Sequence, residues 1–261
     1  MAHKARLSVW ILLIFPLAMG NVLQPPSICN AEEAIHKGGE RKLVAQNMNK
    51  RKKSNENRKT ERIVIIGASF AAGWNPKEIA GLAVVNKGVG GEQSSEMLLR
   101  FEKDVLSLNP RAVVIWGFIN DIFRSKREEI DATVSRTKQN IKEMVRVAQD
   151  NQIAAIIATE LTIKGQDSWL ETLASWVGRI MGKQSYQDYI NRHVLAMNQW
   201  VREYAKAQGL ALLDLQPLLS DAQGIRKMEY ATEDGIHVSS KGYEKLTSYA
   251  SGVLVDHLKT Y

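Results

Sequence analysis

Cysteine is nearly absent from this chain, since Cys29 is the only one among 261 residues. A single thiol excludes an intramolecular disulfide and a multi-cysteine metal site. Nucleotide-binding glycine patterns are also missing. The cluster Gly88-Val89-Gly90-Gly91 has neither the Gly-Lys-Ser/Thr ending nor the G-x-G-x-x-G order, which argues against a nucleotide site.

Charge is distributed unevenly along the chain. Residues 1–62 hold 12 Lys and Arg against 5 Asp and Glu, whereas residues 63–261 hold 23 of each sign. The formal net charge of +7 therefore belongs wholly to the N-terminal part. Within it, residues 36–62 combine basic charge with few large apolar side chains, a composition typical of a disordered linker. The alternative is that this basic linker binds an anionic envelope surface. Nucleic acid is not expected as a partner, because no aromatic side chains alternate with the basic ones.

The extreme N-terminus has the layout of a secretory signal. Lys4 and Arg6 precede an almost wholly apolar run at residues 7–23, and small residues follow by Ala31. Pro16 interrupts this run, which is shorter than the roughly 20 residues that a spanning helix prefers. We therefore expect a signal peptide at 1–31, a basic linker at 32–62 and one domain at 63–261, with an uncleaved membrane anchor as the alternative. A lipid-modified Cys29 is disfavoured because bulky Ile28 precedes it.

From residue 63 onward, short β-branched runs alternate with amphipathic stretches. This alternation predicts a parallel sheet covered by helices. The expected strands are residues 63–66, 83–85, 112–116, 153–159 and 210–214. The expected helices are residues 94–106, 127–150, 187–208 and 241–258, the last with Ser239 or Ser240 as N-cap.

Three side chains have the types and spacing required for acyl transfer. Ser69 follows the first expected strand, and Asp234 and His237 lie three residues apart near the C-terminus. A serine nucleophile needs a general base, and the base needs a carboxylate that fixes its tautomer. An open α/β sheet can bring these distant segments together because its parallel strands end at one edge. Asp214 also ends a strand, but no histidine follows it at this spacing.

Four separated motifs resemble those of the SGNH (GDSL-type) hydrolase family. Each follows an expected strand or precedes the last expected helix, in the family's order. They are Ile66-Gly67-Ala68-Ser69, Asn86-Lys87-Gly88-Val89-Gly90-Gly91, Gly117-Phe118-Ile119-Asn120-Asp121 and Thr232-Glu233-Asp234-Gly235-Ile236-His237. The resemblance implies a flavodoxin-like α/β fold of three layers, with about five parallel strands between helices.

The resemblance also assigns roles to individual residues. Ser69 would be the nucleophile, His237 the base and Asp234 its orienting acid. The backbone N–H groups of Ser69 and Gly91 and the side-chain amide of Asn120 would form the oxyanion hole, where such donors stabilise the tetrahedral intermediate.

Two positions depart from the family pattern. Ala68 replaces the usual acidic residue before the serine. Two residues, Phe118 and Ile119, separate Gly117 from Asn120 where the family usually has one, so we expect a small bulge to return the amide to its place.

The interval at residues 160–185 is longer than an ordinary strand-to-helix connection of roughly 2 to 6 residues. It carries apolar side chains at helical spacing, including Trp169 and Trp176. One interpretation is a lid over the catalytic edge that contacts substrate. The other is a helix that packs on the domain as core.

Together these features predict an exported serine esterase, periplasmic or extracellular, that uses no metal or cofactor. The residues fit several substrates: O-acetyl groups of envelope or extracellular carbohydrate, a lysophospholipid, or a small acyl ester. Acyl transfer to a sugar hydroxyl would use the same residues, and a non-catalytic envelope-binding protein is the alternative from another class. We expect a monomer.

Overall fold

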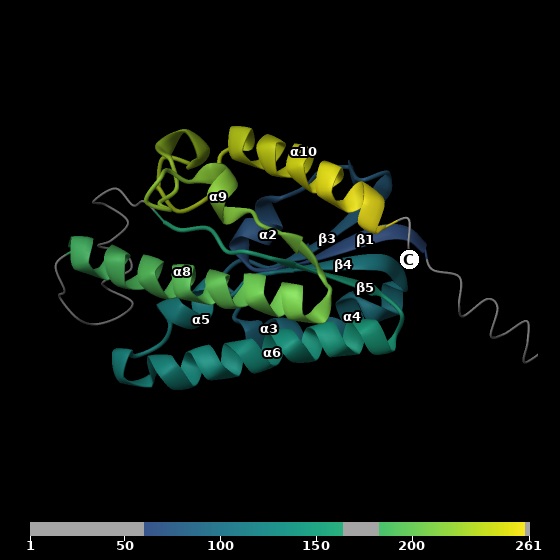
Figure 1. The fold of residues 1–261 in the computed structure, drawn as a ribbon, viewed down its shortest axis with the longest axis horizontal. Helices are drawn as coiled ribbons and strands as arrows, with labels where there is room; N and C mark the ends of the chain where they lie inside the picture. Colours follow the sequence, from purple (N-terminus) through teal and green to yellow (C-terminus); the bar gives the residue numbers. More distant parts are fainter. Residues whose placement is uncertain (1–59, 164–182, 259–261) are drawn as a thin grey trace, which may run out of the picture. The chain divides into compact units, whose positions relative to one another are not determined.

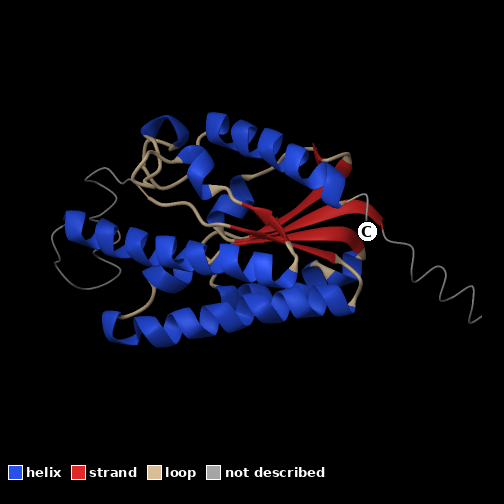
Figure 2. Ribbon diagram, in the orientation of Figure 1, coloured by secondary structure: helices blue, strands red, loops and turns tan. Residues whose placement is uncertain are grey.

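The computed structural model describes residues 60–163 and 183–258 of the chain. These residues form a layer of strands between helices (Figures 1 and 2). Five strands run parallel: β1 (Thr60–Gly67), β3 (Leu82–Gly88), β4 (Pro110–Trp116), β5 (Ala154–Ala158) and β6 (Ala211–Leu213). A short strand that the sequence did not predict, β2 (Glu78–Ile79), pairs antiparallel with β3.

The order of the strands is β2-β3-β1-β4-β5-β6. Without the edge strand β2, the sheet has the flavodoxin-like order in which the first strand lies between the second and the third. The predicted fold class is therefore confirmed, with one added antiparallel strand. In such a sheet the chain reverses its winding direction between β1 and β4, and ligands bind beyond the carboxyl ends of those strands.

Burial explains which strands lie at the centre. Residues 63–67 of β1 and 112–116 of β4 are buried, as expected for strands covered by helices on both faces. Helix α10 (Ser240–His257) lies over one face, whereas α6 (Ile130–Asp150) and α8 (Lys183–Gln208) lie on the other (Figure 1). Helix α6 turns a stripe of apolar residues and threonines to the core at intervals of three or four residues, including Ile141, Met144 and Ala148.

The long helices match the sequence predictions within a few residues, and Ser239 is the N-cap of α10, accepting a hydrogen bond from the Gly242 N–H at 3.3 Å. The helix expected at residues 94–106 is wrong as one element. It is divided into α3 (Ser94–Leu99), α4 (Phe101–Asp104) and a 3₁₀ turn at Leu106–Leu108. The division occurs because Arg100 leaves helical backbone geometry, with φ −98° and ψ 4°.

Three short helices were not predicted: α2 (Ser69–Gly73), α5 (Ile119–Phe123) and α9 (Gln216–Leu219). Each begins within a few residues of the carboxyl end of a strand. Within the described residues, no helix is long and apolar enough to cross a membrane. The apolar run at residues 7–23, residues 32–59 of the expected basic linker, and Trp169 and Trp176 all lie outside the described residues. The last three residues expected in that linker, 60–62, belong instead to β1, so the domain begins slightly earlier than residue 63.

Candidate active site

The carboxyl ends of three neighbouring strands bring the first three sequence motifs to one edge. Gly67 of β1 pairs in register with Gly88 of β3 and Trp116 of β4. A Cβ on Gly67 would come within 1.8 Å of the Trp116 carbonyl oxygen, so only glycine fits between these backbones. Ser69 follows Gly67 by two residues and is the first residue of α2.

The segment that carries Ser69 is fastened by Asn86 of β3. The Asn86 side-chain amide donates to the carbonyl oxygens of Ala71 and Trp74, each at 2.8 Å. Its own oxygen accepts from the Gly88 N–H at 2.7 Å. A single asparagine therefore ties the turn after Ser69 to the end of the neighbouring strand, a role that sequence reasoning missed although Asn86 opens the second motif.

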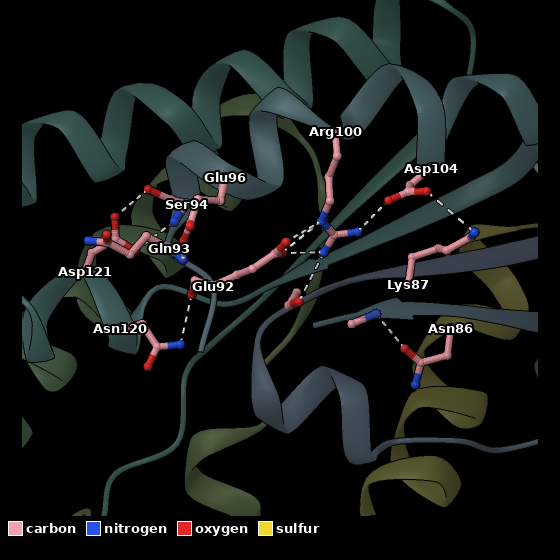
Figure 3. A network of polar contacts seen from close by, with 12 residues as sticks. Asn86, Lys87, Glu92, Gln93, Ser94, Glu96, Arg100, Asp104, Asn120 and Asp121 are labelled. Atoms are coloured by element: carbon pink, nitrogen blue, oxygen red, sulfur yellow. Dashed lines mark hydrogen bonds and ion pairs between the residues drawn. The ribbon is translucent and has the colours of Figure 1, made fainter. Parts of the chain in front are cut away.

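The other two oxyanion-hole candidates are Gly91, in the turn before α3, and Asn120, on α5. Gly91 has φ +81°, a left-handed conformation that favours glycine. The Asn120 side-chain amide donates to the Glu92 carbonyl oxygen at 2.9 Å, which connects the second motif to the third (Figure 3). An amide nitrogen carries two hydrogens, so one remains for a substrate oxyanion.

The extra residue of the third motif lies at the junction between β4 and α5. The strand ends at Trp116, and Phe118 forms the N-cap of α5 with φ −155° and ψ −2°. Asn120 is then the second residue of α5. The insertion that the sequence suggested as a small bulge is thus taken up in the turn into this helix.

Asp234 and His237, the acid and base candidates, lie in one tight turn and contact each other. The Nδ1 atom of His237 lies 2.5 Å from Asp234 Oδ2. The other carboxylate oxygen accepts from the Thr232 hydroxyl and the Ile236 N–H, each at 2.7 Å, and from the His237 N–H at 2.9 Å. Because Nδ1 faces the carboxylate, the imidazole can present Nε2 as the basic nitrogen.

These contacts also keep Asp234 ionised. Partial burial would raise the pKa of Asp234, but the hydrogen bonds from Thr232, His237 and the backbone outweigh it and lower that pKa well below its usual value. The His237 side chain is 51% exposed, so its imidazole is accessible from solvent.

The Ser69 segment and the His237 turn are connected through other side chains. The Tyr243 hydroxyl of α10 donates to the Phe70 carbonyl oxygen at 2.9 Å. The guanidinium of Arg226 contacts both the Phe70 ring and the backbone between Asp234 and His237. Within the part of the chain that the structure describes, Ser69 and His237 make no direct hydrogen bond.

A polar network supports the loop between Gly91 and α3 (Figure 3). Arg100 donates to both carboxylate oxygens of Glu92 at 2.6 to 2.9 Å and to Asp104 at 2.9 Å. Asp121 is buried and accepts from the N–H and hydroxyl of Ser94, at 2.9 and 2.6 Å. Burial raises the pKa of Asp121, although these hydrogen bonds oppose it. Both carboxylate oxygens of Asp121 are occupied by Ser94, so this residue of the third motif connects α5 to the start of α3.

Two other residues near the site went unrecognised in the sequence. Glu160 is buried two residues beyond the end of β5, and its carboxylate accepts from the Phe118 N–H at 2.8 Å. The sequence could have indicated Glu160, because a charged residue follows an almost wholly apolar strand there.

The burial of Arg226 could not be predicted, because nothing in its local sequence indicates it. Asp214, which was considered as an alternative acid, forms an ion pair with Arg202 at 2.9 Å.

The chain is thus an α/β protein in which three of the four sequence motifs follow the carboxyl ends of neighbouring strands, and the fourth precedes α10. Residues 65–245 match the model of the GDSL-like Lipase/Acylhydrolase family. The chain belongs to this family of carboxylic ester hydrolases.

Solved structures with the same fold include three bacterial proteins. A proposed acylhydrolase from Bacteroides fragilis is 24% identical with a TM-score of 0.60, over 80% of this chain and 93% of that one. A GDSL-like lipase from Bacteroides thetaiotaomicron is 22% identical with a TM-score of 0.58, over 77% and 88%. An acetylxylan esterase from Geobacillus stearothermophilus, solved as a catalytic mutant, is 17% identical with a TM-score of 0.54, over 74% and 94%. No curated protein sequence matches the chain significantly.

Proposed function

We propose that this chain is a serine esterase that hydrolyses an O-acyl ester through Ser69, His237 and Asp234. The observation that carries the proposal is the 2.5 Å contact between His237 Nδ1 and Asp234 Oδ2 in an exposed turn. That contact orients a base. The Arg226 contacts tie its turn to the segment that begins with Ser69, and the Tyr243 hydrogen bond ties the following helix α10 to the same segment. A base held in one tautomer beside a serine is the arrangement required for nucleophilic catalysis.

The reaction proceeds in two acyl-transfer steps. The Ser69 hydroxyl oxygen attacks the ester carbonyl carbon while His237 takes its proton, and the carbonyl oxygen becomes an oxyanion. The N–H groups of Ser69 and Gly91 and the Asn120 amide stabilise that charge. The intermediate then collapses to the acyl-enzyme as His237 protonates the leaving alcohol. Water, activated by the same imidazole, releases the acid and restores Ser69.

Fluorophosphonate labelling tests this assignment, because these probes react with activated serines. We expect one label per chain, located at Ser69 by peptide mass spectrometry. The Ser69→Ala variant should fold, as judged by circular dichroism, and take up no label. Labelling that persists in this variant would remove Ser69 from the mechanism.

We further propose carbohydrate O-acetyl groups as the substrate class. The support is the shared fold with an acetylxylan esterase and the export signal expected at residues 1–31. We expect faster hydrolysis of p-nitrophenyl acetate than of the octanoate ester, and acetate release from acetylated xylo-oligosaccharides. A preference for the octanoate ester would favour a lipid substrate, and transfer of the acetyl group to an added sugar would favour an acyltransferase.

Export is likewise a proposal, supported by the charge and hydropathy of the N-terminal residues. We expect the mature chain to begin near Glu32. An intact N-terminus, together with salt-resistant sedimentation with membranes, would indicate an anchored protein instead. Loss of envelope binding as salt rises would support adhesion through the basic linker, because salt screens exposed charges.

A further inference from the structure

Arg226 is a buried cation in direct contact with the acid–base turn. Its side chain is fully buried, in the segment that follows α9. The Nη2 atom donates to the carbonyl oxygen of Gly235 at 2.8 Å and also to that of Ile236. These are the two residues between Asp234 and His237. One guanidinium nitrogen therefore fixes the backbone that sets the position of the base.

The same guanidinium lies over the segment of the nucleophile. Its central carbon is 5.4 Å from the centroid of the Phe70 ring, within the range of a cation–π contact. Phe70 directly follows Ser69 and is itself buried. Arg226 thus contacts the residue that follows Ser69 and the backbone between Asp234 and His237, two segments separated by more than 160 residues in sequence.

The backbone of Arg226 is held independently of its side chain. Its N–H donates to the Thr162 hydroxyl at 2.9 Å, and that hydroxyl donates to the Gly224 carbonyl oxygen at 2.9 Å. Arg226 also forms an isolated antiparallel bridge with Ser220. Because these contacts fix the Cα atom, the guanidinium approaches the turn from a defined position.

Packing alone does not account for an arginine here. Burial lowers the pKa of Arg226 to about 10, although Asp234, Tyr243 and Glu160 oppose the decrease, so the group is a cation at neutral pH. Within the described structure, its Nε and Nη1 atoms are buried without a hydrogen-bond partner. A buried charge that is incompletely paired is costly, and an apolar side chain of similar volume is often as stable.

We propose that Arg226 is a positioning residue, which holds the Asp234–His237 turn at the distance from the Ser69 segment that proton transfer requires. The inference rests on the proposed triad. Displacement of a catalytic group by roughly 1 Å lowers turnover on the order of 100-fold without changing which groups are present.

The test compares Arg226→Met, Arg226→Lys and the matched control Arg202→Met in the full chain. Arg202 lies on α8 and forms an ion pair with Asp214 at 2.9 Å. Its substitution therefore removes an arginine ion pair outside the proposed site. We expect Arg226→Met to lower kcat on the order of 10- to 100-fold, with KM changed less than about 2-fold. Arg226→Lys should be intermediate, since an ammonium keeps the charge but not the planar fork. Arg202→Met should keep wild-type kcat.

Proton NMR adds a readout that a general loss of stability would not move. The proton between His237 Nδ1 and Asp234 should give a downfield signal in the wild type and in Arg202→Met. We expect this signal to shift or broaden in Arg226→Met.

The outcomes separate this inference from the proposed function. A wild-type chain that fluorophosphonate does not label at Ser69 would refute the triad itself. A labelled wild type with unchanged kcat and NMR signal in Arg226→Met would overturn the positioning role alone, as would an equal loss of kcat in Arg202→Met. Should Arg226→Met fail to fold, Arg226→Lys decides, and wild-type turnover in that variant would overturn the role.

Discussion

Glu160 makes the stability of the fold depend on pH in a direction opposite to that of most carboxylates. It is 1% exposed, and its Oε2 accepts from the N–H groups of Phe118 at 2.8 Å and Ile119 at 3.4 Å. Burial raises the pKa of Glu160 to about 7, the hydrogen bonds oppose this, and nearby Asp121 adds to it. Glu160 in turn opposes the decrease in the pKa of Arg226 and adds to the increase in the pKa of Tyr243, which places both groups in its electrostatic surroundings.

The size of the effect follows from the two pKa values of Glu160. Between its ordinary value of 4.5 and about 7, the folded state binds a proton that the unfolded state does not. The stabilisation from this proton is complete below pH 4.5 and is lost as the pH rises through about 7. A difference of this size corresponds to about 3 kcal/mol.

Urea unfolding of the wild type and of Glu160→Gln at several pH values between 5 and 8 measures this contribution. Glutamine keeps the oxygen that accepts from the Phe118 N–H but cannot ionise, and the other titrating groups are common to both proteins. We expect the wild type to lose about 2 to 3 kcal/mol relative to Glu160→Gln from pH 5 to pH 8. Parallel stability curves for the two proteins would refute the reasoning, because Glu160 would then titrate alike in the folded and unfolded states.

Three further predictions concern the proposed site. Asn120→Ala should lower kcat by roughly 100-fold or more with little change in KM for p-nitrophenyl acetate, and a change confined to KM would mean that the amide binds the ground state. Gly91→Ala should lower both kcat and stability, the latter by about 1 to 2 kcal/mol, because φ is +81° and the new Cβ would lie 3.3 Å from the Arg124 guanidinium. Asp234→Asn should lower kcat on the order of 10⁴-fold, since the His237 tautomer is no longer fixed, and a pH-independent rate above 10% of wild type would contradict that role.

The sequence predicted the sheet better than its surroundings, for a physical reason. Buried parallel strands such as β1 and β4 consist of continuous β-branched runs, which are visible without tertiary information. The two-residue strand β2 has no such signal, since it depends on pairing with β3. The break at Arg100 was also invisible, because the residues around it have helical spacing and the guanidinium reaches partners on other segments.

The same limit applies to the site. Local motifs led to the prediction of Ser69, Gly91, Asn120, Asp234 and His237 as site residues, and each of them lies near the carboxyl ends of the strands or in the turn before α10. Residues that act between segments could not be found in this way. Arg226 contacts positions 9 and 10 residues ahead and a ring that lies far earlier in the chain.

Glu92 shows how the fold turns separate motifs into one unit. Its carbonyl oxygen accepts from the Asn120 amide at 2.9 Å, while its carboxylate is held by Arg100 at 2.6 to 2.9 Å. Arg100 also donates to the Gly67 carbonyl oxygen at 3.4 Å, two residues before Ser69. The residue next to Gly91 therefore sets the orientation of Asn120 and is itself fixed relative to Ser69. These contacts connect the three segments that carry the proposed donors, which is the kind of rigid support that a preorganised oxyanion hole requires.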